Sequence, residues 1–535
     1  MKHHSITFLF FLSLTFFWGK QQAQDSWQDV HKPALVSQPL HIVSDEFEFR
    51  GTENLILLPE NRNDPYSRKI AIHFLHFPAQ IKDSLAPVFF LPGGPGGSFE
   101  RRDFDLERGG VWSKVWTYEL KSLNKYRDLI LINQRGNSEA PGLPISDFRY
   151  RYRRGYKDKA FDQLAKSKRQ AEAFGKALEE FQKKGIDVRG YDMIHMVDDI
   201  EDVRKQFGYK KIALVGASFG AQWAFAYMKR YENQVDRVLM SSVEPLNNTY
   251  DDPFELWKAY QRLAKEADND PKLKGTLPEI GIEAAYKEVV KKLEKGPMRI
   301  PLDIPEAEIK DTIEVGLGDL HYSPMSPIAE SRRDALASWP KYVTELYEGD
   351  FRLLALRIYL GRGGFSSSSV FGHLIDNSLG ITAERDRLIL SREENRWLGD
   401  PPANYRQTKK VSLTAVVSDE FRLPKTQNFP LLMIQGDMDW NTPLANATDI
   451  LPYYPQGHLI TVGKGTHGSR RELILDNPEL GDLILHFMDI DLEKEKLSDY
   501  FDQLPDRHDL PALEFTPIEG ESLYEKLKKE VLEDG

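Results

Sequence analysis

The chain of 535 residues contains no cysteine, and this absence excludes several kinds of chemistry at once. Without thiols the protein forms no disulfide, no thiolate zinc site, no iron–sulfur cluster and no lipidated N-terminal cysteine. A cysteine nucleophile is excluded for the same reason, so covalent catalysis has to use another side chain.

Basic residues are in deficit, because 71 Lys and Arg stand against 82 Asp and Glu and give a net charge of −11. Binding to the phosphate backbone of a nucleic acid needs a clustered basic face, so this balance argues against a nucleic-acid partner. Hydrophobic residues make up 41% and charged residues 29% of the chain, which is ordinary for a soluble globular protein. The length is ample for a large core.

Long hydrophobic runs are scarce, and the most prominent one lies at residues 6–18, after Lys2. It is shorter than the about 20 residues of a membrane-spanning helix and has the length of a signal-peptide core. We expect residues 1–24 to direct export and to be removed near Ala23, with an uncleaved N-terminal anchor as the alternative. The expected mature protein is periplasmic or secreted and has no membrane span.

Short apolar runs alternate with helical patterns along the chain, which is typical of an α/β sheet with crossover helices. The runs VFFL, LILI and LLMI are apolar throughout, as expected of strands buried on both faces of a mostly parallel sheet. Helical spacing of apolar residues predicts helices over residues 160–184 and 193–207. Strands are expected at residues 69–77, 87–91, 128–132, 211–215, 238–240, 431–434 and 459–462.

From residue 246 to residue 428 the pattern is largely helical, and the strand pattern returns at Phe429. We therefore expect one α/β core, formed by residues 25–245 and 429–492, with residues 246–428 inserted as a mainly helical cap. Residues 493–535 are charged and interrupted by proline, and form the expected C-terminal tail. The Gly- and Ser-rich residues 361–369 are expected to form a mobile loop.

Residues 216–220 (GASFG) match the pattern G-x-S-x-G between an expected strand and an expected helix. In that setting the two glycines relieve crowding around a strained turn that lifts the serine hydroxyl off the sheet. Ser218 is therefore the candidate nucleophile. The alternative is an ordinary strand–helix turn that happens to contain serine.

A glycine-rich turn at residues 92–97 (PGGPGG) follows another expected strand. It lacks the spacing of a phosphate-binding loop. Its backbone N–H groups can face a developing oxyanion without obstruction by side chains. The expected oxyanion donors are the N–H of Gly94, with Gly93 as the alternative, and that of Phe219, the residue after the nucleophile.

A serine nucleophile needs a base, and the base needs an acid that orients it. In chains with this kind of turn the order is serine, acid, histidine. Among 13 histidines, His467 lies in a Gly-rich loop that follows an expected strand and comes after a similarly placed acid. Asp437 and Asp439 compete for the role of that acid; Asp439 is favoured, and the other is expected to cap the next helix.

Together these motifs resemble the prolyl and tripeptidyl aminopeptidase family of α/β-hydrolases, serine peptidase family S33. The resemblance rests on the PGGPGG turn, the sequence NQRG at residues 133–136, the serine turn, G-x-x-D-x-x-T-P at residues 436–443 and His467-Gly468, in family order. It covers residues 50–245 and 429–470. It implies an α/β-hydrolase fold with a helical cap, a triad of Ser218, Asp439 and His467, no metal or other cofactor, and removal of residues from free peptide N-termini.

Three positions depart from the pattern of that family. Pro92 stands where prolyl aminopeptidases have histidine, Asn133 stands where aspartate is usual, and Phe219 replaces the usual tyrosine after the nucleophile. None of these changes removes a reacting group, but each weakens the inference that this protein shares the substrate preference of that family.

An enzyme that acts at free N-termini has to recognise an ammonium group, which calls for carboxylates near the nucleophile. Glu244 is the candidate, because it follows an expected strand at the junction with the cap; a surface glutamate or a salt bridge between cap and core is the alternative. Arg135 is expected to brace loops, with substrate contact as the alternative. An esterase or other non-peptide hydrolase on the same scaffold, or a non-catalytic binding protein, are the competing functions.

Overall fold

The computed structural model describes residues 34–43, 47–82, 85–99, 101–104, 106–136, 149–155, 159–303, 312–322, 333–362, 364–400 and 402–533. The expected export segment, residues 1–24, lies outside these ranges. Within them, no helix combines the length and the apolar character that crossing a bilayer requires.

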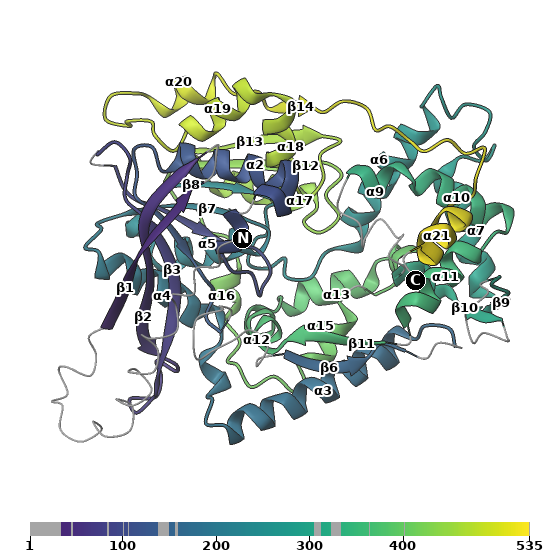
Figure 1. Ribbon diagram of the computed structural model, residues 1–535, viewed down its shortest axis with the longest axis horizontal. Helices are drawn as coiled ribbons and strands as arrows, with labels where there is room; N and C mark the ends of the chain where they lie inside the picture. Colours follow the sequence, from purple (N-terminus) through teal and green to yellow (C-terminus); the bar gives the residue numbers. More distant parts are fainter. Residues whose placement is uncertain are drawn as a thin grey trace, which may run out of the picture.

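A ten-stranded sheet forms the centre of the core (Figure 1). Strands β1, β2, β3 and β5 pair in antiparallel fashion, and every pair from β5 to β14 is parallel. In sheet order the strands are β1 (Ala34–Val43), β2 (Glu48–Pro59), β3 (Lys69–Phe77), β5 (Leu129–Ile132), β4 (Val88–Leu91), β7 (Ile212–Ala217), β8 (Val235–Ser241), β12 (Leu431–Gly436), β13 (Gly457–Gly463) and β14 (Arg507–Asp509).

Both faces of the parallel strands are buried, as the continuous apolar runs predict. Along β4, Phe89 and Leu91 belong to one apolar cluster, whereas Val88 and Phe90 belong to another. The alternation follows from the two-residue period of a strand. The first cluster is covered by α4 (Met193–Gln206), α5 (Phe219–Arg230) and α17 (Leu444–Ile450), and the second by α2 (Leu106–Leu123), α18 (Ser469–Asp476), α19 (Pro478–His486) and α20 (Leu497–Phe501). The expected mostly parallel α/β sheet is confirmed.

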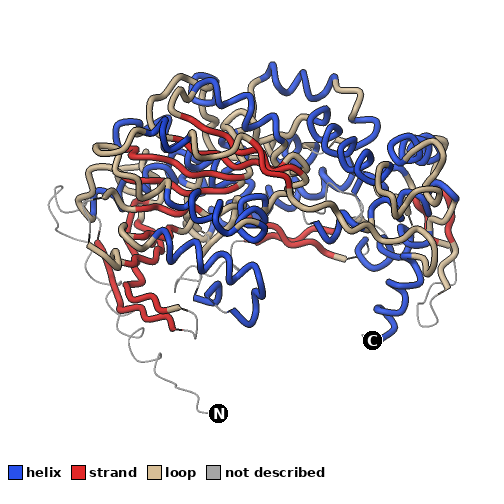
Figure 2. Tube along the Cα trace, turned by 90° about the horizontal axis from the view of Figure 1, so that it is seen from above, coloured by secondary structure: helices blue, strands red, loops and turns tan. Residues whose placement is uncertain are grey.

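A separate apolar core lies beyond the sheet. Seen from above, the strands of the sheet occupy one side of the molecule, and the C-terminal helix lies at the opposite end (Figure 2). Met438 and Trp440, from the loop after β12, also belong to this core, and the Trp440 ring lies 4.7 Å from that of Tyr260. The helices and strands that form this separate apolar core are α6 (Pro253–Asp268), α7 (Ile282–Glu294), β9 (Met298–Ile300), β10 (Ile313–Val315), α8 (Leu317–Tyr322), α9 (Arg333–Ala337), α10 (Trp339–Glu348), α11 (Arg352–Arg362), α14 (Asn395–Leu398) and α21 (Leu523–Glu533).

The remaining helices gather around a second, small sheet below the main one in Figure 1. In this sheet β6 (Arg149–Arg153) pairs in antiparallel fashion with β11 (Phe365–Ser369). The expectation of a mobile loop at residues 361–369 is therefore wrong. Helix α11 ends at Arg362 and strand β11 follows, because a partner strand from a distant part of the chain satisfies the backbone hydrogen-bonding groups of β11. The surrounding helices are α3 (Gln163–Lys183), α12 (Val370–Leu379), α13 (Ala383–Ser391), α15 (Ala403–Thr408) and α16 (Asp419–Arg422).

Candidate active site

Ser218 occupies a tight turn between β7 and α5. Its backbone has φ 57° and ψ −131°, a region that a residue with a side chain rarely adopts. A Cβ atom on Gly216 would lie 2.5 Å from the Gly220 carbonyl oxygen, and one on Gly220 would lie 2.3 Å from the Leu91 carbonyl oxygen. Both positions therefore admit only glycine, which explains the G-x-S-x-G spacing. The Ser218 N–H donates to the Ser242 carbonyl at 3.0 Å and fixes the turn against the end of β8.

The glycine-rich turn after β4 lies against Ser218. Gly94 and Ser218 line the same cavity, and a Cβ atom on Gly93 would lie 3.7 Å from Ser218 Cβ. Gln134 braces the turn, because its Oε1 accepts from the Gly96 N–H at 2.7 Å and its Nε2 donates to the Gly93 carbonyl at 2.9 Å. Phe219 begins α5, where first-turn N–H groups have no acceptor within the helix and negative charge is favoured.

His467 and Asp439 meet beyond the ends of the neighbouring strands β13 and β12. The Nδ1 atom of His467 lies 3.0 Å from each carboxylate oxygen of Asp439. Asp439 is completely buried, and its carboxylate accepts from the Thr442 N–H at 3.0 Å, the Thr442 hydroxyl at 2.7 Å and the Asn441 N–H at 2.9 Å. These bonds hold the carboxylate toward the imidazole. The Ser242 hydroxyl donates to the His467 carbonyl at 2.6 Å and so ties the histidine loop to the serine turn.

The competing acid, Asp437, faces away from His467. Its carboxylate accepts from the Lys464 N–H at 2.8 Å and from an Arg507 nitrogen at 2.8 Å, beside β14. The expectation that the spare acid caps the next helix is wrong, because α17 follows Pro443 and has no side-chain cap. The strand β14, which brings Arg507 to this place, carries no apolar signal in the sequence.

The electrostatics of the pair favour a charged, oriented histidine. Burial alone would lower the pKa of His467, but the charge and hydrogen bond of Asp439 outweigh it and raise the pKa above its ordinary value of 6.5. Burial alone would raise the pKa of Asp439, but His467 and the bonds from Thr442 lower it overall. Asp439 therefore stays ionised at neutral pH.

The raised pKa of His467 predicts where activity is lost in acid. A general base acts in its neutral form, so kcat/KM falls as pH drops through this pKa. We expect the acidic midpoint of the pH profile above 6.5, and Asp439→Asn should move the midpoint of the residual activity lower, because the charge and hydrogen bond of Asp439 contribute most to raising this pKa. Profiles of kcat/KM for the two proteins test this, and a wild-type midpoint at or below 6.5 contradicts it.

A cavity of about 240 Å³ opens beside Ser218, between residues of the core and residues of the cap. Among the described residues, neither the Glu244 nor the Asp251 carboxylate makes a hydrogen bond or an ion pair. Burial, and then neighbouring negative charges, raise the pKa of Glu244 well above its ordinary value and that of Asp251 to about 8, although Arg385 and His467 act to lower the latter. The lining residues are Gly94, Ser218, Glu244, Thr249, Tyr250, Asp251, Pro402, Tyr405 and Asn441.

A third carboxylate, that of Asp376 on α12, lies close to this cavity. Burial raises its pKa to about 8, and it too has no hydrogen-bond or ion-pair partner among the described residues. The charge of Asp376, burial, and then the charges of Glu244 and Asp251 raise the pKa of Tyr405, so all three carboxylates act on this one ring. The sequence indicated only Glu244; Asp251 and Asp376 lie in the helical insertion, where no local pattern distinguishes them from its other acids.

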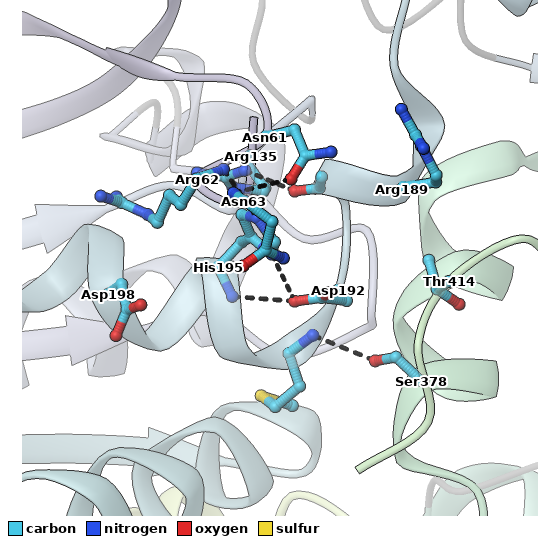
Figure 3. Close-up of polar contacts among 12 residues, drawn as sticks. Asn61, Arg62, Asn63, Arg135, Arg189, Asp192, His195, Asp198, Ser378 and Thr414 are labelled. Carbon is cyan, nitrogen blue, oxygen red and sulfur yellow. Dashed lines mark hydrogen bonds and ion pairs between the residues drawn. The ribbon is translucent and has the colours of Figure 1, made fainter. Parts of the chain in front are cut away.

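Arg135 braces loops of the core, as expected, and is not among the residues that line the cavity. Figure 3 shows it beside Asn61 and Arg62. Its guanidinium is buried and donates to both carboxylate oxygens of Asp199, at 2.8 and 2.6 Å, and to the Glu60 carbonyl at 2.8 Å. Arg62 joins the same network through Asp199, and its N–H donates to His195 Nε2 at 3.0 Å. Within the described ranges, no group of three or more His, Asp or Glu side chains is arranged to hold a metal ion.

We compared the sequence and the structure with those of known proteins. A sequence profile described as the alpha/beta hydrolase fold matches residues 86–271. The search of curated proteins found no significant match.

Solved structures resemble the chain only remotely. A serine hydrolase from Cycloclasticus zankles is 12% identical, with a TM-score of 0.30, over 85% of this chain and 98% of that one. A meta-cleavage product hydrolase from Pseudomonas fluorescens is 14% identical, with a TM-score of 0.33, over 78% and 94%. A bromoperoxidase from Bacillus anthracis is 13% identical, with a TM-score of 0.31, over 82% and 100%. None of the three is described as an aminopeptidase.

Proposed function

Since the chain has the α/β-hydrolase fold, we propose that it is a serine hydrolase that releases residues from the free N-termini of peptides. One observation carries the peptidase assignment: the cavity beside Ser218 is lined by the carboxylates of Glu244 and Asp251, which have no partner in the part of the chain that the structure describes. Buried carboxylates without partners favour a cationic ligand. The ammonium group of a peptide N-terminus is such a ligand, and it lies close to the first peptide bonds of the chain.

The proposed reaction is acyl transfer through a covalent intermediate. His467 removes the proton of Ser218, and the Ser218 oxygen attacks the substrate carbonyl while Asp439 stabilises the imidazolium. The N–H groups of Gly94 and Phe219 bind the oxyanion. His467 then gives its proton to the leaving amine, and a water molecule, activated by the same histidine, releases the acyl group from Ser218.

The acidic cavity discriminates between charged and uncharged N-termini. In the empty cavity, burial and mutual repulsion favour protonated Glu244 and Asp251, as the direction of their raised pKa values shows. An entering ammonium group attracts the ionised form of a carboxylate and stabilises it. An acetylated N-terminus carries no charge and does not attract the ionised carboxylate. Its amide group also loses its hydration when it enters the cavity.

A peptide series tests the proposal directly. We expect kcat/KM for a peptide with a free N-terminus to exceed that of its N-acetylated form by about 100-fold, since hydrogen bonds to charged groups contribute about 1.5–3 kcal/mol each. Equal cleavage of both forms, or turnover of a simple ester alone, would falsify the aminopeptidase assignment. Labelling by a fluorophosphonate identifies a serine hydrolase in either case.

Substitution of Glu244 and Asp251 tests whether these two carboxylates bind the ammonium group of the peptide. Glu244→Gln and Asp251→Asn should each raise KM for the free peptide about tenfold and narrow the gap to the acetylated peptide. Glu279→Gln serves as the control, because Glu279 is an exposed glutamate of the insertion and does not line the cavity. If all three variants keep the wild-type ratio of free to acetylated peptide, the carboxylates do not bind the ammonium group.

A further inference from the structure

A second cavity, of about 420 Å³, borders the active-site cavity on the side of the cap, and we call it the side pocket. Tyr250 lines both cavities, and its ring stacks on that of Tyr405 with 5.2 Å between the ring centres. The two cavities therefore share a wall. The side pocket is lined by Tyr250, Ile381, Ala383, Asp386, Arg406, Lys409, Val416, Val417, Ser418, Asp419 and Arg422.

The side pocket is lined by three cationic side chains and two carboxylates, in contrast to its acidic neighbour. Arg406 forms ion pairs with Asp386 at 2.9 Å and with Asp400 at 2.5 Å, and Arg422 pairs with Asp419 at 2.5 Å. The ammonium group of Lys409 makes no hydrogen bond or ion pair with any residue that the structure describes. Of the three cations that line the pocket, Lys409 is thus the one without a carboxylate in contact among the described residues.

Lys409 lies close to one of the arginines. A Cβ atom on Gly380 would be 3.6 Å from Lys409 Nζ and 3.9 Å from an Arg422 terminal nitrogen. The two cationic groups converge at this corner of the side pocket.

A buried hydrogen-bonding group of the side pocket also lacks a partner. Tyr250 is 3% exposed, and its hydroxyl makes no hydrogen bond to a described residue. Buried hydroxyl groups are nearly always bonded, because leaving one unpaired destabilises the protein. The hydroxyl lies near the charges of this pocket: after burial and Asp376, it is Asp386 that raises the pKa of Tyr250, and Arg406 and Arg422 oppose the rise.

We infer that the side pocket binds a single carboxylate group, with Lys409 supplying the charge and the Tyr250 hydroxyl a hydrogen bond. The side chains of Ile381, Val416 and Val417 offer apolar contacts to an aliphatic stem. The chemistry favours a monoanion, since Lys409 is one cation without a contacting carboxylate among the described residues, and the carboxylates of Asp386 and Asp419 would repel a phosphate dianion.

Calorimetric titration with pentanoate, a monocarboxylate with an aliphatic stem, tests this inference. Pentanamide has the same shape without the charge and is the matched control ligand. We expect wild-type protein to bind pentanoate at least tenfold more tightly than pentanamide, with weaker binding at high salt. Failure of pentanoate to bind, or equal affinity for the two ligands, overturns the inference.

Three variants locate the binding site. Lys409→Gln should weaken pentanoate binding about tenfold, whereas Lys410→Gln, which removes the same charge from the next and equally exposed residue, should not. Tyr250→Phe should weaken binding to a similar degree without lowering the unfolding temperature, because its hydroxyl makes no hydrogen bond to any residue that the structure describes. Circular dichroism establishes that each variant is folded. Equal affinities of the Lys409 and Lys410 variants would place the ligand elsewhere.

The carboxylate can come from a side chain of the bound peptide or from a free organic acid. Peptides that begin with Glu or Gln separate these sources, and only this measurement rests on the proposed peptidase activity. A preference of wild-type enzyme for the Glu peptide that Lys409→Gln removes assigns the carboxylate to the substrate. Equal kcat/KM for both peptides, with pentanoate still bound, assigns it to a free acid. If no peptide is cleaved, the titration still decides whether the side pocket binds a carboxylate.

Discussion

Ser218→Ala should lower the rate of hydrolysis by on the order of 10⁴- to 10⁶-fold while leaving the protein folded. The substitution removes the oxygen that forms the covalent intermediate, and no neighbouring group replaces it. Folding should be nearly unaffected, because the Ser218 side chain makes no capping bond to α5, and alanine has the same backbone restrictions at φ 57° as serine. The strained turn is imposed by Gly216 and Gly220, which the variant retains.

The measurement is kcat/KM on a peptide with a free N-terminus, together with fluorophosphonate labelling and the unfolding temperature. Ser498→Ala is the matched control, since Ser498 is exposed on α20 and lines neither cavity. Retained turnover or labelling in the Ser218 variant would exclude this residue as the nucleophile. A variant that loses activity together with its fold is to be replaced by Ser218→Gly, which relieves the backbone strain.

Asp439→Asn should lower kcat by about 10³- to 10⁴-fold, the second largest effect that we expect. The asparagine amide can donate to His467 Nδ1 and so stabilise the wrong tautomer, in which the other nitrogen carries the proton and cannot accept one from Ser218. It also removes the negative charge that raises the pKa of His467. The acidic midpoint of any residual activity should therefore fall.

Asp437→Asn makes the same chemical change two residues earlier and is the control. Its carboxylate contacts Arg507 and the Lys464 N–H and not His467, so the variant should keep kcat within a few-fold of wild type. Some loss of stability at β14 is expected. Equal losses of activity in the two variants would mean that Asp439 has no special place in the reaction.

The centre of the sheet could be predicted from sequence because its strands are buried on both faces, which leaves continuous apolar runs such as those of β4, β5 and β12. Strand β1 could not, since most of its side chains are exposed and no alternation remains. Strand β11 is a run of serines after one phenylalanine, and its strand conformation depends on pairing with β6, more than 200 residues earlier. Pairings of this kind leave no local signal.

The serine, the acid and the histidine could be predicted because each follows a strand of a parallel sheet, whose carboxyl ends lie at one edge. The sequence favours Asp439 over Asp437, but it does not predict the contact that holds Asp437 away from His467, because Arg507 arrives on a strand near the C-terminus. The acids around Tyr405 come from distant parts of the insertion, Asp251 near its start and Asp376 on α12. Only the folded cap brings them together, so no spacing rule could have linked them.

The packing of the Asp439 loop against the cap limits how the cap can change in evolution. Met438 and Trp440, on either side of the acid, are buried in the apolar core of the cap, and Arg262 of α6 donates to the Asp437 carbonyl at 2.8 Å. An inserted segment that rests on the acid loop is not an interchangeable module. In chimaeras between relatives, a transplanted cap should support catalysis only if residues 437–440 are exchanged with it, so substrate range and triad geometry are inherited as one unit.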